Sequence, residues 1–118
     1  MSRYEDLRVW QQARLLAQEI YHRIRTSRLG DDRELSHQLN SASLSVVANI
    51  AEGFLRHRDR EFVQFLRIAQ GSNGEVRALL HVAHDRGYLR DSDCAQLIER
   101  TDAIGRMLRR LEQYLRKD

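Results

Sequence analysis

Leu35-Ser-His-Gln-Leu-Asn-Ser-Ala-Ser-Leu-Ser-Val-Val-Ala-Asn-Ile-Ala51 contains no Asp, Glu, Lys or Arg, in a chain that is 31% charged. The run also lacks Pro and Gly, and its apolar residues recur at helical spacing, which predicts a helix. A helix without a charged face has no fully solvated face. Because its Ser, Asn, Gln and His residues make the run too polar for a membrane span, we expect protein to pack it on most sides, through self-association of the chain.

Composition narrows the class of protein. A chain of 118 residues fits one domain, residues 1–118, with a core of its own. The single cysteine, Cys94, excludes an intrachain disulfide, and no apolar run has membrane-spanning length, so we expect a cytoplasmic protein without a membrane partner. The formal net charge is +3, and Lys117 is the only lysine among 20 basic residues. Arginine suits phosphate and carboxylate recognition because its guanidinium presents a planar fork of donors.

Apolar periodicity predicts four helices in this proline-free chain. Their expected ranges are residues 4–27, 32–54, 59–86 and 92–116. Long helices with short connections predict an all-α, antiparallel up-down-up-down four-helix bundle. Gly87 is a typical residue for the end of the third helix. Gly71 and Gly74 lie inside that helix, where each costs about 1 kcal/mol relative to Ala, so we expect another helix to approach closely there.

Two apolar stripes run along the second predicted helix. One stripe consists of Leu35, Leu39, Ala42, Val46, Asn49 and Gly53, and the other of Leu44, Val47, Ala51 and Leu55. Two stripes need two packing partners, which we interpret as the core of the domain and a second copy of the chain. The residues assigned to core or oligomer packing are Leu44, Val47, Asn49, Ala51, Glu52 and Gly53. Glu52 needs a partner if it is buried, and Arg56 is spaced to provide one.

An ordered series of short motifs carries a family resemblance. The motifs are Asp6-Leu7-Arg8-Val9-Trp10-Gln11, Asn49-Ile50-Ala51-Glu52-Gly53, Glu61-Phe62-Val63-Gln64-Phe65-Leu66, Ile68-Ala69-Gln70-Gly71-Ser72, Gly87-Tyr88-Leu89 and Ile104-Gly105-Arg106-Met107-Leu108. In this order they resemble the four-helix-bundle proteins encoded in intervening sequences of bacterial large-subunit ribosomal RNA genes. The resemblance covers nearly the whole chain.

The resemblance implies an antiparallel four-helix bundle that assembles into a ring-like homopentamer. A relative of that family is the accessory variability protein of diversity-generating retroelements, a basic pentameric barrel that binds a reverse transcriptase and nucleic acid. No enzymatic activity is established for the family. The resemblance therefore implies a scaffold whose partners are other copies of itself, RNA or DNA, or a partner protein.

Two clusters of arginine are the candidate nucleic-acid-binding residues. Arg56, Arg58 and Arg60 surround the turn between the second and third predicted helices, and Arg106, Arg109 and Arg110 lie on the fourth. In an antiparallel bundle this turn and the end of the fourth helix share one end of the molecule. Phosphate binding there would be electrostatic and steeply salt-dependent. The alternative is that these arginines are ordinary solvated surface residues.

Other chemistries find less support. Glu19 with His22 and Glu34 with His37 have the Glu-x-x-His spacing of di-iron bundles, but both pairs flank one short connection instead of facing each other across a core. Cys94 occupies a core position of the fourth helix and is interpreted as a small buried hydrophobe. We expect no catalytic residues, no metal and no cofactor. Beside a metal-binding bundle enzyme, two hypotheses stay open: a scaffold that binds nucleic acid or a partner protein, and a protein-only module that recognises an acidic partner.

Overall fold

Four long helices dominate the computed structural model, which describes residues 2–117. They are α1 (Arg8–Thr26), α2 (Arg33–Leu55), α3 (Asp59–Asp85) and α4 (Asp91–Leu115). Two short 3-10 helices, η1 (Tyr4–Asp6) and η2 (Arg28–Asp31), precede α1 and α2, and residues 2–117 contain no strand. The predicted all-helical fold is confirmed. No helix in this range is both long and apolar enough to cross a lipid bilayer.

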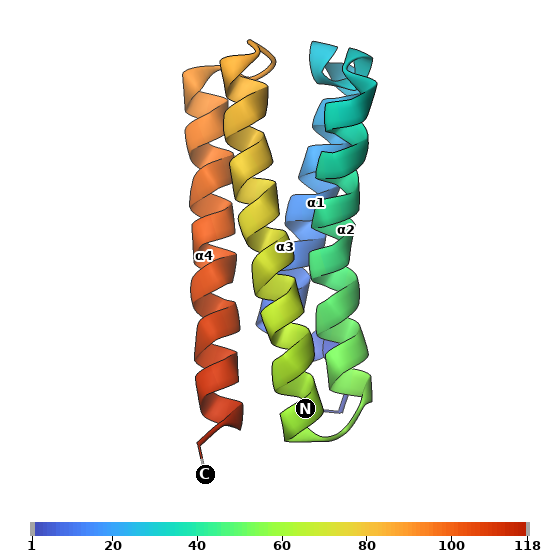
Figure 1. The fold of residues 1–118 in the computed structure, drawn as a ribbon, viewed down its shortest axis with the longest axis vertical. Coiled ribbons are helices and arrows are strands. Elements are labelled where there is room, and N and C mark those ends of the chain that lie inside the picture. Colours follow the sequence, from blue (N-terminus) through green and yellow to red (C-terminus); the bar gives the residue numbers. More distant parts are fainter. Residues whose placement is uncertain (1, 118) are drawn as a thin grey trace.

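The helices lie side by side along a molecule that measures 46 × 20 × 19 Å. Figure 1 shows consecutive helices joined by short turns at alternating ends, with the α2–α3 turn and both chain termini at one end. In this view α3 lies between α4 and α2, and α1 lies behind.

Helix α2 buries one apolar stripe in the core. Leu39 and Ile50 are completely buried, and the stripe consists of Leu35, Leu39, Ala42, Val46, Ile50 and Gly53. The prediction placed Asn49 in this stripe, but the three-and-four spacing continues through Ile50 instead. Asn49 is half-buried, and its Nδ2 donates to the carbonyl and the Oγ of Ser45 at 2.8 and 3.0 Å. In α4 the predicted core position of Cys94 is confirmed, and Leu97, Thr101, Ile104 and Leu108 are buried on the same helix.

The start of α1 departs from the expected range, whereas α2 begins where it was expected and is held there by contacts from elsewhere in the chain. Helix α1 begins at Arg8, several residues later than predicted, because Leu7 is extended after η1. Asp32 caps α2 by accepting from the Leu35 amide, and it also accepts from Arg86 Nη1 at 2.9 Å and Tyr88 Oη at 3.0 Å. The start of α2 is thereby tied to the α3–α4 turn.

Glycines mark one close helix contact and two open positions. A Cβ on Gly53 would lie 2.7 Å from Phe65 Cβ and 2.8 Å from Phe62 Cδ1, so Gly53 brings α2 against α3 within the same chain. Within the described residues nothing lies within 4 Å of a Cβ at Gly71 or Gly74, so the expected close approach at these two positions is wrong. Gly87 ends α3 with a φ of +82°, as predicted, and the Tyr88 amide donates to the Ala83 carbonyl.

We predict that Gly53→Ala lowers the free energy of unfolding by about 1–3 kcal/mol, because its methyl group overlaps side chains that cannot both retreat. Gly71→Ala is the matched control and should raise it by up to about 1 kcal/mol, since the site is open and Ala favours a helix. Urea unfolding at a fixed protein concentration measures both. A Gly53→Ala protein as stable as Gly71→Ala would refute the contact.

Candidate functional site

A groove between α3 and α4 collects basic side chains near the end of the bundle that carries the chain termini. It has a volume of about 480 Å³ and is lined by Asp59, Arg60, Val63, Gln64, Arg67, Leu115 and Arg116. We call it the end groove. Arg60 and Arg67 are seven residues apart on α3, which is close to two helical turns, so both project towards α4. The start of α3 and the end of α4 bring Arg60 and Arg116 into the same groove.

Glu112 organises the inner side of this groove. Its carboxylate accepts from Gln70 Nε2 at 2.8 Å, from Arg67 at 3.1 Å and from Arg116 at 3.3 Å, and the side chain is only 13% exposed. The hydrogen bond from Gln70, helped by Arg67, holds the pKa of Glu112 below its ordinary value. Glu112 is therefore a carboxylate at neutral pH that fixes two arginines of the end groove.

A second hollow lies further along the same two helices. This middle groove has a volume of about 290 Å³ and is lined by Gln70, Asn73, Gly74, Arg77, Asp102, Gly105, Arg106 and Arg109. Arg77 is paired with Asp102 at 2.8 Å, and Arg106 is 3.5 Å from Glu99. Within residues 2–117, Arg109 has no acidic partner. The middle groove thus keeps an arginine free for a ligand.

The six predicted arginines divide between the grooves and their surroundings. Arg60, Arg106 and Arg109 line the two grooves, whereas Arg56, Arg58 and Arg110 are not among the lining residues. Arg56 instead pairs with Glu52 at 3.0 Å and lies 5.0 Å above the ring of Phe65. The side chain of Arg58 is 80% exposed.

Two groove arginines on α3 were missed by the sequence analysis. Arg67 and Arg77 stand apart from the dense clusters that drew attention to the other basic residues. The spacing of seven from Arg60 to Arg67, and again from Gln70 to Arg77, is a signal that places each pair on one helix face. The spacing points to a groove only once α4 is known to pack beside this face of α3.

The outer surface of α2 has the opposite character. Leu44 is 52% exposed and lines a shallow groove of about 310 Å³ against α1, together with Tyr21, which is 43% exposed. On the α3 side, Ser45 and Ser72 are joined by a hydrogen bond of 2.8 Å in a groove of about 360 Å³. The uncharged run is therefore only partly covered by its own chain.

The predicted packing residues of α2 fall on different sides of it. Gly53 is buried against α3, and Val47 and Ala51 are half-buried. Leu44 and Glu52 are exposed. The pairing predicted for Glu52 with Arg56 is present, although the pair lies at the surface.

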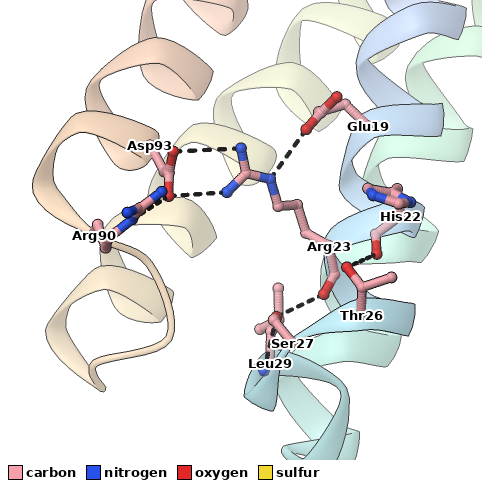
Figure 2. Close-up of polar contacts among 8 residues, drawn as sticks. All are labelled: Glu19, His22, Arg23, Thr26, Ser27, Leu29, Arg90 and Asp93. Carbon is pink, nitrogen blue, oxygen red and sulfur yellow. Dashed lines mark hydrogen bonds and ion pairs between the residues drawn. The ribbon is translucent and has the colours of Figure 1, made fainter.

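An ion-pair network ties α1 to α4 at the opposite end from the termini (Figure 2). Arg23 donates from Nε to Glu19 at 3.0 Å, and its Nη1 lies 3.1 Å from Asp93. Asp93 also accepts from Arg90 at 3.1 Å. The hydrogen bond from Arg23 is the main cause that lowers the pKa of Asp93, followed by the one from Arg90.

Glu19 and Cys94, two of the residues considered for metal or covalent chemistry, make other contacts here. Glu19 is engaged by Arg23, and no three His, Cys, Asp or Glu side chains between residues 2 and 117 are grouped as metal ligands would be. Cys94 is buried, with Sγ 3.9 Å from the Leu80 carbonyl oxygen, and burial raises the pKa of its thiol. A buried thiol with a raised pKa is a poor nucleophile, in line with a packing role.

We predict that Asp93→Asn destabilises the protein near neutral pH and that the difference disappears in acid. The pKa of Asp93 is lower in the folded chain, so its stabilising contribution is complete above the unfolded pKa of about 3.9 and is lost as the pH falls through the folded pKa. Thermal unfolding of both proteins from pH 7 to pH 2 tests this. Asp85→Asn, at a 79% exposed side chain, is the control. An equal loss of stability in the two variants at pH 7 would show that the ion pair of Arg23 with Asp93 does not stabilise the fold.

Comparison with known proteins places this chain in a family. It matches the family model described as 23S rRNA-intervening sequence protein over residues 5–110. Its structure is similar to the crystal structure of a protein of unknown function from the S23 ribosomal protein family of Bacteroides thetaiotaomicron, with a TM-score of 0.80 and 18% identity over 89% of this chain and 95% of that one. A search of curated proteins gave no match. Since the family model covers most of the sequence, the chain belongs to the 23S rRNA-intervening sequence protein family.

Proposed function

We propose that this protein is a non-enzymatic, homo-oligomeric scaffold that binds nucleic acid through the α3–α4 grooves. The observation that carries the proposal is the excess of arginine there. Six arginines line the end and middle grooves, namely Arg60, Arg67, Arg77, Arg106, Arg109 and Arg116, against the three carboxylates of Asp59, Asp102 and Glu112. A basic strip along two helices attracts a phosphate backbone independently of its sequence.

The arginines have two roles in this proposal. Arg67 and Arg77 are held by Glu112 and Asp102, which makes them parts of the groove walls. Arg60 and Arg109 have no acidic partner within residues 2–117, so phosphates can pair with them without breaking an existing ion pair. Binding through such residues releases counterions and weakens with salt.

Self-association is the second part of the proposal. The uncharged face of α2 exposes Leu44 beside Tyr21, and a second copy would cover these apolar side chains. The family resemblance supports antiparallel bundles arranged as a ring-like homopentamer. Such a ring would repeat the basic grooves on every subunit, and linked sites bind a polyanion more tightly than one site does.

A protein partner with acidic side chains is the second candidate. It is favoured by the carboxylates that the groove arginines already bind within the chain, as in the pair of Arg77 and Asp102. A carboxylate and a phosphate engage the guanidinium in the same forked geometry. Co-purification with and without nuclease separates the two, because a protein partner stays bound after nucleic acid is digested.

We predict that the double variant Arg60→Gln, Arg109→Gln binds nucleic acid at least tenfold more weakly than the wild type at 50 mM salt. For duplex DNA, the slope of log affinity against log salt should fall by about 0.9 for each lost phosphate contact, which is about 1.8 in all. Fluorescence anisotropy with labelled duplex DNA and RNA of matched sequence measures both quantities.

The control for this experiment is Arg58→Gln, Arg110→Gln, which removes the same charge outside the grooves. It should keep most of the affinity. Wild-type protein that binds neither probe at 50 mM salt would refute nucleic-acid binding and favour the acidic partner. Equal losses of affinity in both double variants would mean that binding depends on the net charge of the protein and not on the grooves.

We predict that Leu44→Lys shifts the oligomer towards monomer, because it places a charge in the apolar contact between copies. Sedimentation velocity across a dilution series measures the mass. Tyr114→Lys, at a residue 70% exposed on α4, is the control and should leave the mass unchanged. An unaltered oligomer in Leu44→Lys, or a monomeric wild type, would rule out this α2 contact.

A further inference from the structure

We propose that the middle groove seats a single phosphodiester of the bound nucleic acid, between Gly74 on α3 and Gly105 on α4. This inference rests on the proposed function and gives it a specific contact. It concerns one hollow, one anionic group and the two donors Asn73 and Arg109, and it is distinct from the general attraction that the basic grooves exert.

Space for the group comes from two missing side chains. Gly74 lines the groove, and no atom of residues 2–117 lies within 4 Å of the position that its Cβ would take. Gly105 lines the same groove from α4, where only Arg109 and Asn73 lie near its Cβ position. Neither glycine has a positive φ, so backbone conformation does not demand glycine at these sites. Open room between the helices is what the two residues provide.

Two donors of different kinds converge on one point beside Gly105. Arg109 Nη1 lies 3.3 Å, and Asn73 Nδ2 lies 3.5 Å, from the position that a Gly105 Cβ would occupy. Arg109 has no acidic partner within residues 2–117. An oxygen atom near this point accepts from a guanidinium and an amide together, which is a typical way to hold a phosphate.

Asn73 is an unusual residue for its position. It is 94% buried between α3 and α4, since only 6% of its surface is exposed. Its Nδ2 donates to the Thr101 carbonyl at 2.9 Å, which leaves the second N–H of the amide for another acceptor. Its Oδ1 is shielded from solvent and has no partner within residues 2–117. This oxygen accepts hydrogen bonds and cannot bind an anion, so only the N–H group of Asn73 contributes to the phosphate contact. A ligand at the floor of the groove would give the free N–H its partner.

Charge and shape favour a phosphodiester in a chain over a small free anion. Arg77 neutralises Asp102 at 2.8 Å, so the carboxylate in the groove does not oppose an anion. Arg106 stands at the rim with only the 71% exposed Glu99 beside it. The end groove, with Arg60, continues along the same two helices. A polymer that carries regularly spaced phosphates can occupy both hollows at once, whereas a single anion fills only one.

The test fills the space beside Gly74 in the middle groove without altering any charge. Gly74→Leu places an apolar side chain in the groove, and Gly71→Leu places the same side chain on the same helix outside it. Both sites are free of neighbours within 4 Å, and both variants gain helix propensity, so both are expected to fold. Circular dichroism and sedimentation confirm fold and mass before binding is measured. Labelled duplex DNA is titrated from 50 to 300 mM salt.

We expect Gly74→Leu to weaken binding about tenfold at 50 mM salt and to reduce the slope of log affinity against log salt by about 0.9, the value for one phosphate contact. Gly71→Leu should match the wild type. As a second variant, Gly105→Ala puts one methyl group at the convergence point of the two donors and should weaken binding in the same direction. Every arginine is retained in these proteins, so a lower slope reports a lost contact.

Two results would refute phosphodiester binding between Gly74 and Gly105, and they have different consequences for the proposed function. If wild-type protein binds DNA while Gly74→Leu and Gly105→Ala bind equally well with an unchanged slope, the seat is wrong and the proposed function stands. If the wild type does not bind duplex DNA at 50 mM salt, both the proposed nucleic-acid binding and the phosphodiester site in the middle groove are wrong.

Discussion

The packing of one face of α2 against α3 is the constraint on which the rest of the structure depends. Gly53 lets α2 approach until a Cβ would overlap Phe62 and Phe65, and this contact fixes the rotation of α2 about its axis. Because residues 35–51 contain no Asp, Glu, Lys or Arg, no charged side chain favours exposure of the opposite face of α2 to solvent. The buried stripe decides which side faces inwards, and Leu44 is left outside as a consequence.

The contact between α3 and α4 is built differently, and this difference creates the candidate site. Polar groups join the two helices at Asn73 with Thr101 and at Gln70 with Glu112. Gly105 adds no side chain to that interface. The polar contacts between α3 and α4 are accompanied by grooves at the surface, as is the polar contact of Ser45 with Ser72 between α2 and α3, whereas the apolar contact at Gly53 is tight. The basic grooves are lined by α3 and α4, whereas exposed Leu44 lines a groove between α1 and α2.

Part of the candidate site was predictable from the sequence and part was not. Clustering of basic residues led to Arg60, Arg106 and Arg109, which the structure places in the grooves. The same clustering also led to Arg56, which pairs with Glu52 instead. Arg67 escaped notice because its partner Glu112 is 45 residues away along the chain. A charge count in a local window does not register pairs that form only when two helices pack.

The sequence by itself determined the four helices, their short turns and the family to which the chain belongs. Apolar periodicity and the glycine at residue 87 act within a few residues, so both can be recognised in the sequence without knowing which helix packs beside them. Tertiary structure alone decided that Gly53 is a contact inside the chain, that Gly74 opens onto a groove, and that Arg23 ties α1 to Asp93 of α4. The physical reason is that these roles depend on the rotation and register of packed helices, which the core sets through all its contacts together.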